Sequence, residues 1–245
     1  PVLNEERHLA DSVRMVLGQD WPGELEVVLA LGPSHDRTDA VAADLAAADP
    51  RVRTVPNPSG RTPDALNAAI GASTGDIVAR VDAHAEIPVD YLSLAVAALE
   101  ETGADNVGGI MDAVGVSPLE RAIACAMKSP LGVGGARFHT GGGAGEADTV
   151  YLGVFRRSAL ERVGGYDPHF ERAQDWEMNW HIRQAGGLVC FTPELVVAYR
   201  PRRSLPALAR QYRDYGRWRR VVAALHEGSI NARYLAPPAA LVACA

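Results

Sequence analysis

The sequence predicts an α/β protein in which a mostly parallel central sheet carries helices on both faces. Two observations support this fold class. Short apolar runs of strand length alternate with segments of helical pattern through the first half of the chain, and the connectors between them are short. Such an alternation builds crossover units, which place strands parallel and helices on both faces. The length of 245 residues and the hydrophobic fraction of 47% suit one large α/β domain or two small ones.

The first half supplies the alternating elements in order. Asn4 is expected to cap the first helix, whose apolar stripe runs from Leu9 to Leu17. Thr62 and Pro63 mark another helix start, a cap followed by proline in the first turn. The expected strands cover residues 25–31, 51–55 and 76–82, and the further helices cover residues 38–48, 62–70 and 88–102.

The second half is expected to be of mixed order. A glycine-rich stretch, residues 132–145, lacks the residue order of a P-loop and is expected to form a mobile lid with glycine hinges. Gly186 and Gly187 are expected to close a helix over residues 175–185. The other expected elements are strands over residues 106–111 and 150–155, a helix over residues 118–127, two short strands around Val189 and Val196, and a basic helix over residues 206–225.

Charge and cysteine content narrow the classes of function. The net charge of −6 and the pI near 5.6 argue against a protein that binds nucleic acid through its overall charge. The three cysteines, Cys125, Cys190 and Cys244, match no metal-ligand spacing, so unbridged thiols in a reducing compartment are expected. Because the chain opens on Pro1 and closes within an apolar run, both ends are expected to be cut.

Charged side chains stand near the carboxyl ends of the expected strands, where parallel sheets bind ligands. Asp82 and His84 follow a strand, and a carboxylate and an imidazole two residues apart can hold one divalent ion. For this triplet alone, an aspartate that caps the turn is the better explanation. Arg61 precedes a helix N-terminus and suits an anion clamp, with a solvated loop arginine as an equal alternative.

Asp175 stands at the start of an expected helix. The helix dipole keeps a carboxylate there ionised, so that it can accept a proton, and an ordinary helix cap is the alternative. Trp176 and Trp180 are four residues apart and therefore share one face of that helix. They suit either the core or a platform on which a sugar ring stacks.

Taken in order, these motifs resemble glycosyltransferase family 2, the inverting enzymes of the GT-A fold. The resemblance covers about residues 1–203, and it is closest to the bacterial exopolysaccharide and succinoglycan type. The matched segments are P-x-x-N-E at residues 1–5, G-S-x-D-x-T at residues 33–38, G-K/R-x-x-A-L-N at residues 61–68, D-x-D at residues 82–84, G-G-F/Y-D/E at residues 164–167 and the E-D pair at Gln174 and Asp175.

The resemblance implies domains, an activity and roles. A GT-A domain would cover residues 1–203, with a nucleotide-binding half to about residue 110 and an acceptor half over residues 111–203. It would move a sugar, with inversion, from a nucleoside-diphosphate donor, expected to be UDP-linked, to a saccharide or polyprenyl-linked acceptor. Asp175 would be the general base, and Asp82 and His84 would hold Mn²⁺ or Mg²⁺. The implied donor contacts are Pro1, Asn4, Glu5, Asp36, Arg61, Asn67 and Asp82, and the implied acceptor contacts are Tyr166, Gln174 and Trp176.

Three departures from the family pattern fall within residues expected to form the site. His84 replaces the second acid of D-x-D, Gln174 replaces the first acid of the E-D pair, and Leu31 stands where family members carry an acid that holds the base or ribose. These departures favour one alternative, a binding module without turnover. A sugar nucleotidyltransferase is the other alternative. Such an enzyme is expected to carry a lysine- and glycine-rich loop after the first strand.

Residues 204–245 are expected to form a basic helix and an apolar tail. The arginines at positions 210, 213, 217 and 220 recur at three- and four-residue steps and share a helix face. With the aromatic residues beside them, they predict a helix that faces a membrane. Because exopolysaccharide-type members act on lipid-linked acceptors, the resemblance implies the cytoplasmic face of the plasma membrane. A basic helix packed on the domain is the alternative.

Two residues of this helix match a further family motif. Arg217 and Trp218 correspond to the end of the Q-x-x-R-W motif of processive members, so they are candidates for contact with a diphosphate or a membrane. Asp214 stands where that motif has glutamine, and processivity is therefore not expected.

Overall fold

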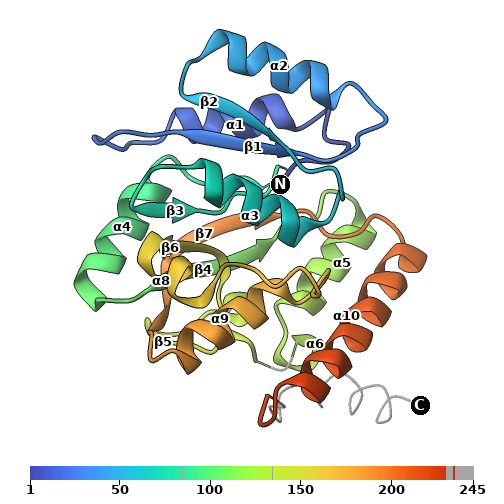
Figure 1. Cartoon of the computed structure of the whole chain (residues 1–245). Coiled ribbons are helices and arrows are strands. Elements are labelled where there is room, and N and C mark those ends of the chain that lie inside the picture. Colours follow the sequence, from blue (N-terminus) through green and yellow to red (C-terminus); the bar gives the residue numbers. More distant parts are fainter. Residues whose placement is uncertain (84, 134, 230–233, 235–245) are drawn as a thin grey trace.

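The computed structural model confirms the α/β fold class (Figure 1) and describes residues 1–83, 85–133, 135–229 and 234. A parallel two-stranded sheet lies beside a five-stranded sheet with the strand order β3-β6-β4-β7-β5. The strands are β1 (Val27–Leu31), β2 (Val52–Pro56), β3 (Ile77–Ala79), β4 (Asn106–Ala113), β5 (Gly145–Glu146), β6 (Tyr151–Arg156) and β7 (Val189–Tyr199).

Helices separate most of these strands along the chain. They are α1 (Leu9–Leu17), α2 (Thr38–Ala48), α3 (Thr62–Ala72), α4 (Tyr91–Thr102), α5 (Pro118–Met127), α6 (Pro130–Val133), α7 (Arg137–Thr140), α8 (Arg157–Val163), α9 (Gln174–Gln184) and α10 (Leu205–Leu225). The start of α3 fits the sequence prediction, because Pro63 lies in its first turn, where no backbone N–H is needed.

The five-stranded sheet is mixed. β4 and β7 pair in parallel, and Val2 adds a parallel bridge to Leu31 beside the small sheet. β6 runs antiparallel between β3 and β4, and β5 runs antiparallel to β7. The chain between β4 and β6 passes through α5, α6, α7 and the short strand β5, and β6 returns antiparallel to β4.

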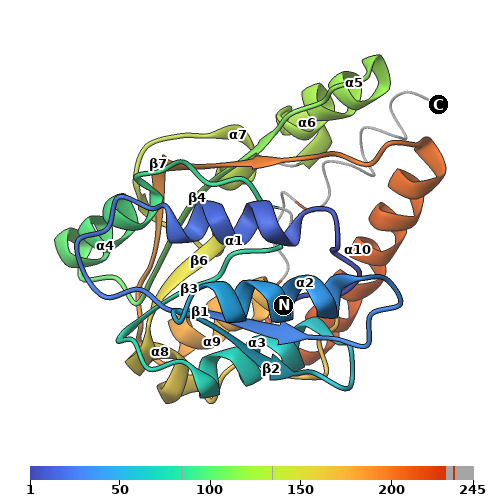
Figure 2. The same ribbon diagram turned by 90° about the horizontal axis from the view of Figure 1, so that it is seen from above.

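Helices cover both faces of the five-stranded sheet. Successive strand residues point to opposite faces, so Val154 packs in a core with α4, while Phe155 packs in a second core with α3, α8 and α9. A third core joins α1 and α2 to the small sheet through Leu9, Ala42 and Leu29 (Figure 2). The layered arrangement predicted from the alternation of elements is therefore confirmed.

The N-terminal helix begins later than expected. Asn4 does not cap it, because α1 starts at Leu9 and His8 occupies the cap position. Asn4 instead adopts a left-handed backbone (φ 56°), and its side-chain oxygen accepts a hydrogen bond of 2.8 Å from the amide of His35. Its function here is to hold two loops together, which a helix-start pattern does not reveal.

The region after β6 also differs from the prediction. The chain forms α8 directly after β6, and one strand, β7, replaces the two short strands expected around Val189 and Val196. The register of β7 against β4 shifts between Gly108 and Ile110. A side chain at Gly109 would meet the carbonyl oxygen of Leu195, so glycine permits the close approach at this irregularity. This irregularity in the register explains why the sequence predicts two short strands, although the structure has one continuous strand, β7.

α10 lies along the outside of the molecule, and its C-terminal part lies next to α9 (Figure 1). Four of its five arginines, at positions 210, 213, 217 and 220, are exposed, so the shared basic face predicted from their spacing is present. Within the described ranges, no helix combines the length and apolar character needed to cross a membrane. The predicted apolar tail, residues 235–245, and Cys244 lie outside the described residues.

Candidate active site

A cleft of about 1140 Å³ lies where strand ends, the start of α9 and one side of α10 come together. It gathers several residues that the sequence proposed separately. Asp82 and Asp175 line it, as do Pro1, Glu5, Gln174, Trp176 and Trp218. His84, the second predicted metal ligand, lies outside the described residues.

Arg80 joins the two aspartates of the cleft. Its side chain is only 8% exposed, its Nε donates a hydrogen bond of 3.0 Å to Asp82 Oδ1, and its Nη1 donates to Asp175 Oδ1. Arg80 follows the end of β3, and its backbone amide remains bonded to β6 through Gly153. Because residues two apart in an extended chain point the same way, Arg80 and Asp82 reach the cleft together.

The start of α9 places Asp175 at the cleft. Ala173, which precedes the helix, adopts a left-handed conformation (φ 62°) that is rare for residues other than glycine, and such strain is concentrated at functional sites. The turn sets Gln174 and Asp175 in the first helical positions, and the Asp175 side chain retains 39% exposure. Burial raises the pKa of Asp175 above that of an ordinary carboxyl, although Arg80 opposes this shift.

Three predicted donor contacts near the first strand occupy different positions. Glu5 lines the cleft, and its backbone amide donates to Thr38 Oγ1 over 2.7 Å. Asp36 instead accepts a 3.0 Å bond from the amide of Thr38, and hydrogen bonds to Thr38 lower the pKa of its carboxyl. Asn4 binds the loop at His35. Asp36 and Asn4 therefore shape the loop beside the cleft and do not line the cleft itself.

Arg61 and Asn67 are also held by other contacts. Arg61 forms an ion pair of 2.8 Å with Asp64, and its Nη1 donates to the carbonyl of Pro168. Asn67 binds the backbone of Tyr166 twice, donating to its oxygen (2.7 Å) and accepting from its nitrogen (2.8 Å). Neither side chain lines the cleft, although Arg61 stands between two lining residues, Gly60 and Thr62.

Of the three predicted acceptor residues, two line the cleft and one lies in the hydrophobic core. Gln174 and Trp176 line the cleft but are 8% and 5% exposed, so only small parts of them face it. Tyr166 is 2% exposed and packs edge-on against Phe155, and burial raises the pKa of its hydroxyl. Tyr166 supports the site from beneath and does not form its surface. Trp218 lines the wall that α10 contributes.

Sequence reasoning missed Arg80 and most of the arginines that line the cleft. Arg200 and Arg202 follow the end of β7, and Arg172 precedes α9. Arg200 lies 3.2 Å from Glu86, and Arg202 Nε donates to Gln211 Oε1 over 3.0 Å. The rule that ligands bind beyond strand ends could have found Arg200 and Arg202, because both directly follow an apolar strand.

The glycine-rich segment borders the cleft. Although it was expected to be without structure, it contains the end of α6 and the whole of α7, and Ala136, Phe138 and His139 line the cleft. Gly134 lies outside the described residues. The glycine-rich segment therefore lies along the cleft, where a lid would have to lie. Its function as a lid remains a prediction.

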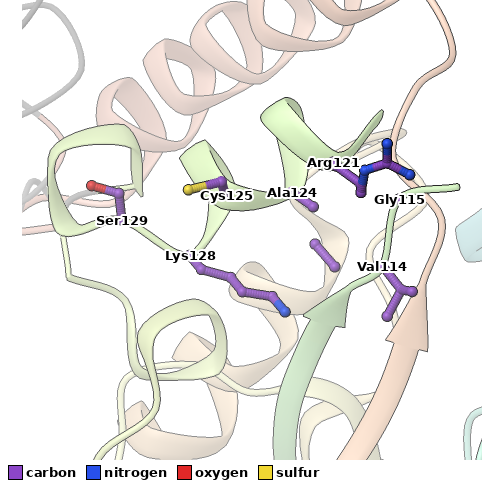
Figure 3. A pocket seen from close by; sticks show the side chains of 8 residues that line it. Val114, Gly115, Arg121, Ala124, Cys125, Lys128 and Ser129 are labelled. Carbon is purple, nitrogen blue, oxygen red and sulfur yellow. The ribbon is translucent and has the colours of Figure 1, made fainter. Parts of the chain in front are cut away.

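A second, open groove of about 630 Å³ lies along α5 (Figure 3). Lys128 extends toward the end of β4, where it pairs with Asp112, and Cys125 and Ser129 lie at the other end of the groove from Arg121. Its lining contains cationic and small side chains but no carboxylate or imidazole. The groove therefore offers neither a general base nor a metal site.

Sequence comparisons point to one family. The profile described as "Glycosyl transferase family 2" matches residues 1–164. The chain is 35% identical over 221 residues to "Succinoglycan biosynthesis protein ExoA" of Rhizobium meliloti (strain 1021), an alignment that covers 89% of this chain and 67% of that protein. It is 25% identical over 246 residues to "Dolichyl N-acetyl-alpha-D-glucosaminyl phosphate 3-beta-D-2,3-diacetamido-2,3-dideoxy-beta-D-glucuronosyltransferase" of Methanococcus voltae, covering 97% and 76%.

Solved structures share the fold. Mannosyltransferase PcManGT from Pyrobaculum calidifontis, in complex with GDP-Man and Mn²⁺, superimposes with a TM-score of 0.72 at 23% identity, covering 99% of this chain and 72% of that one. S. aureus TarS in complex with UDP gives a TM-score of 0.65 at 16% identity, covering 98% and 69%. These similarities concern the fold, and they confirm the GT-A architecture predicted from the sequence.

Proposed function

The chain belongs to glycosyl transferase family 2 and is a glycosyltransferase, and from this premise we propose that it is an inverting, metal-assisted enzyme with Asp175 as general base. The donor is a nucleoside-diphosphate sugar, and we favour UDP as its nucleotide. The proposal rests on the convergence of Asp82 and Asp175 on one buried arginine, Arg80, at the wall of the 1140 Å³ cleft.

In this mechanism a single displacement transfers the sugar. Asp175 takes the proton from the acceptor hydroxyl, whose oxygen attacks the anomeric carbon as the bond to the diphosphate breaks. The attack comes from the side opposite the diphosphate, so the anomeric centre inverts. Arg80 keeps Asp175 in place, while the exposed part of the carboxylate faces the cleft where the acceptor would lie. The raised pKa makes Asp175 a stronger base than an ordinary aspartate.

The departing diphosphate requires positive charge. Arg200, Arg202 and Arg172 line the cleft and can meet phosphate oxygens directly. Asp82 offers a carboxylate at the same wall with 20% of its side chain exposed, which suits a ligand of a divalent cation. Together with His84 it would hold Mn²⁺ or Mg²⁺, and such an ion neutralises charge on the diphosphate oxygens.

The donor and acceptor regions are proposed from the family resemblance. We assign nucleotide binding to residues 1–110 and acceptor binding to residues 111–203, with α10 as a separate wall. The relative from Methanococcus voltae is named for transfer to a dolichyl-linked sugar phosphate, and the relative from Rhizobium meliloti is named for succinoglycan biosynthesis. We therefore propose a saccharide on a polyprenyl-type lipid as acceptor, reached at the cytoplasmic face of the plasma membrane.

Release of nucleoside diphosphate from a panel of donors tests the activity. UDP-glucose, UDP-N-acetylglucosamine and GDP-mannose are incubated with the protein and Mn²⁺, with and without short glycan or polyprenyl-linked acceptors. We expect acceptor-dependent release from one donor, together with a product of inverted anomeric configuration. A sugar nucleotidyltransferase would release pyrophosphate from a nucleoside triphosphate instead. A binding module would bind a donor without releasing any product.

Asp82→Asn is expected to weaken Mn²⁺-dependent binding of UDP by at least about 10-fold, because even indirect partners of a metal site change metal affinity by about 10–100-fold. Metal-free binding of UDP should change much less, since the amide keeps the shape of the side chain. Calorimetric titration of UDP with Mn²⁺, with Mg²⁺ and with EDTA measures the three affinities. Equal losses in all three would show that Asp82 acts through the folding of the cleft and not through a metal ion.

The basic face of α10 is proposed as the membrane contact. Its four arginines are exposed. Tyr212 and Tyr215 are also exposed, and together with Trp218 they line the cleft, so the bilayer role predicted for these aromatic residues stays a prediction. An arginine near an anionic surface contributes about 1 kcal/mol of binding free energy. Four neutralising substitutions, R210Q, R213Q, R217Q and R220Q, should therefore weaken binding to anionic vesicles by about 10²–10³-fold.

Sedimentation with phosphatidylglycerol-containing vesicles measures this binding, which should fall as salt rises. The matched control removes the same charge at four exposed arginines elsewhere, by R7Q, R14Q, R37Q and R121Q. If both quadruple variants bind equally, net charge and not the face of α10 governs the interaction. If the native protein does not pellet at low salt, α10 is simply a basic helix packed on the domain.

A further inference from the structure

One carboxylate and two imidazoles meet between α9 and the C-terminal end of α10. Glu177 and His181 are one helical turn apart on α9, and His226 directly follows α10. One ligand atom from each of the three lies within 4.8 Å of the others. Glu177 Oε1 is 2.6 Å from His181 Nε2 and 3.8 Å from His226 Nε2.

These separations suit a common ion. Zinc binds imidazole nitrogen and carboxylate oxygen at about 2.0–2.1 Å, so neighbouring ligand atoms of a tetrahedral site lie about 3.3 Å apart. The two measured distances fall on either side of that value. Small side-chain rotations would therefore bring all three atoms onto one ion, with water in the fourth position. A glutamate and a histidine four residues apart on a helix already face the same way.

Two of the buried polar atoms in the cluster lack a partner. Within the described part of the chain, Glu177 Oε1 and His226 Nε2 have no hydrogen-bond partner, although their side chains are only 2% and 11% exposed. His181 Nε2 lies 2.6 Å from the Glu177 oxygen, close enough for both atoms to bind the same ion. A buried carboxylate oxygen without a hydrogen bond destabilises a fold, and a cation at this point would remove the penalty.

The surroundings favour a defined metal site. The ring of Trp180 lies 4.1 Å from that of His226 and the ring of Phe170 lies 5.7 Å from it, so aromatic walls limit the access of water.

The cluster is separate from the proposed catalytic centre. Each residue turns a helix by about 100°, so Glu177 lies about 200° around α9 from Asp175. Asp175 faces the cleft, whereas none of the three cluster residues lines it. The cluster instead faces α10, whose other residues, including Trp218 and Arg219, form a wall of the cleft.

We propose that Glu177, His181 and His226 bind a divalent transition-metal ion such as Zn²⁺, and that this ion fastens the end of α10 to α9. Imidazole ligands favour Zn²⁺ over Mg²⁺, which prefers oxygen ligands. The ion would hold the α10 wall of the cleft at a fixed distance from the helix that carries Asp175. This site is independent of the metal that Asp82 is proposed to hold.

Zinc titration of the EDTA-treated protein tests the proposal in an Asp82→Asn background, which removes the carboxylate ligand of the other proposed metal site. We expect one equivalent of Zn²⁺ to bind, and a Tm rise of roughly 5–10 °C at a hundredfold excess over Kd. Mg²⁺ should have no such effect. His181→Ala, which changes a half-exposed side chain, and Glu177→Gln, which keeps its shape, should each weaken zinc binding at least about tenfold.

The matched control is His8→Ala, which removes an exposed histidine far from the cluster and should leave zinc binding unchanged. Trypsin supplies a second readout, because Zn²⁺ should slow cleavage at the arginines of α10 in the control but not in His181→Ala. The proposal is overturned if the Asp82→Asn protein binds no zinc, or if His181→Ala and His8→Ala bind it equally. The second outcome would leave Glu177 and His181 as a simple ion pair.

Discussion

Asp175→Asn is expected to reduce sugar transfer by about 10²–10⁴-fold, the range typical of losing a general base. The amide keeps the shape of the side chain and can still contact Arg80, but it cannot take the proton from the acceptor. Donor affinity should remain within a few-fold of the wild type, because the substitution leaves Asp82 and the cleft arginines, which are proposed to bind the diphosphate, unchanged. The measurement is a comparison of turnover with the affinity for UDP.

Asp11→Asn is the matched control for this variant. Asp11 is also paired with an arginine, Arg14, at 2.6 Å, but on the exposed surface of α1. The same chemical change there should leave turnover unaffected. If Asp175→Asn retains wild-type turnover with an unchanged Tm, then Asp175 is not the base, and another group in the cleft must take the proton.

Much of the fold could be predicted from the sequence, because periodicity reports burial. The helix predicted over residues 38–48 agrees with α2, and the helix predicted over residues 118–127 agrees with α5. The errors occur where a long-range contact decides the local structure. Asn4 has the composition of a helix cap, yet its partner is His35, thirty-one residues away. β7 continues past an irregularity that depends on Gly109 in another strand.

The candidate site was predicted in part. Asp82 and Asp175 are ninety-three positions apart, and motif order alone linked them before the structure brought both to Arg80. Arg80 is a charged residue next to an apolar strand sequence. This pattern could have indicated a buried ion pair before the structure was known. The sequence could not show its second partner, because the contact between residues 80 and 175 depends on how β3 and α9 pack.

The other predicted contacts illustrate a general difficulty. Arg61 and Asn67 belong to a motif that implies donor binding, but their side chains are bound to Asp64 and to the backbone of Tyr166. A motif therefore reports that residues occur together without separating those that touch a ligand from those that shape a loop. The cluster at Glu177 was missed for a related reason, because His226 follows a different helix, forty-nine positions along the chain.

Arg80→Met is expected to lower the free energy of unfolding by about 2–3 kcal/mol. Breaking a buried ion pair by removing one partner costs about 3–5 kcal/mol, and this figure is reduced here because 39% of the Asp175 side chain is exposed. The variant leaves Asp82 and Asp175 together without the cation between them. Urea unfolding of Arg80→Met beside the wild type gives the difference directly.

The same variant should change how activity depends on pH. Burial raises the pKa of Asp175, and Arg80 opposes that rise, so removing Arg80 should raise the pKa further. A base functions when ionised, so turnover falls as the pH drops through this pKa. The acidic limb of the rate profile should therefore move to higher pH in Arg80→Met. Arg80→Lys keeps the positive charge and should shift the limb less.

Turnover at saturating donor, measured from the acidic limb to neutral pH, separates this effect from lost stability. A destabilised but otherwise unchanged enzyme would lose activity at every pH and keep the position of the limb. If the limb stays in place in Arg80→Met although the protein remains folded, then Arg80 does not set the ionisation of Asp175. A limb that moves in the order wild type, lysine, methionine would establish that the buried arginine controls the proton acceptor across the cleft wall.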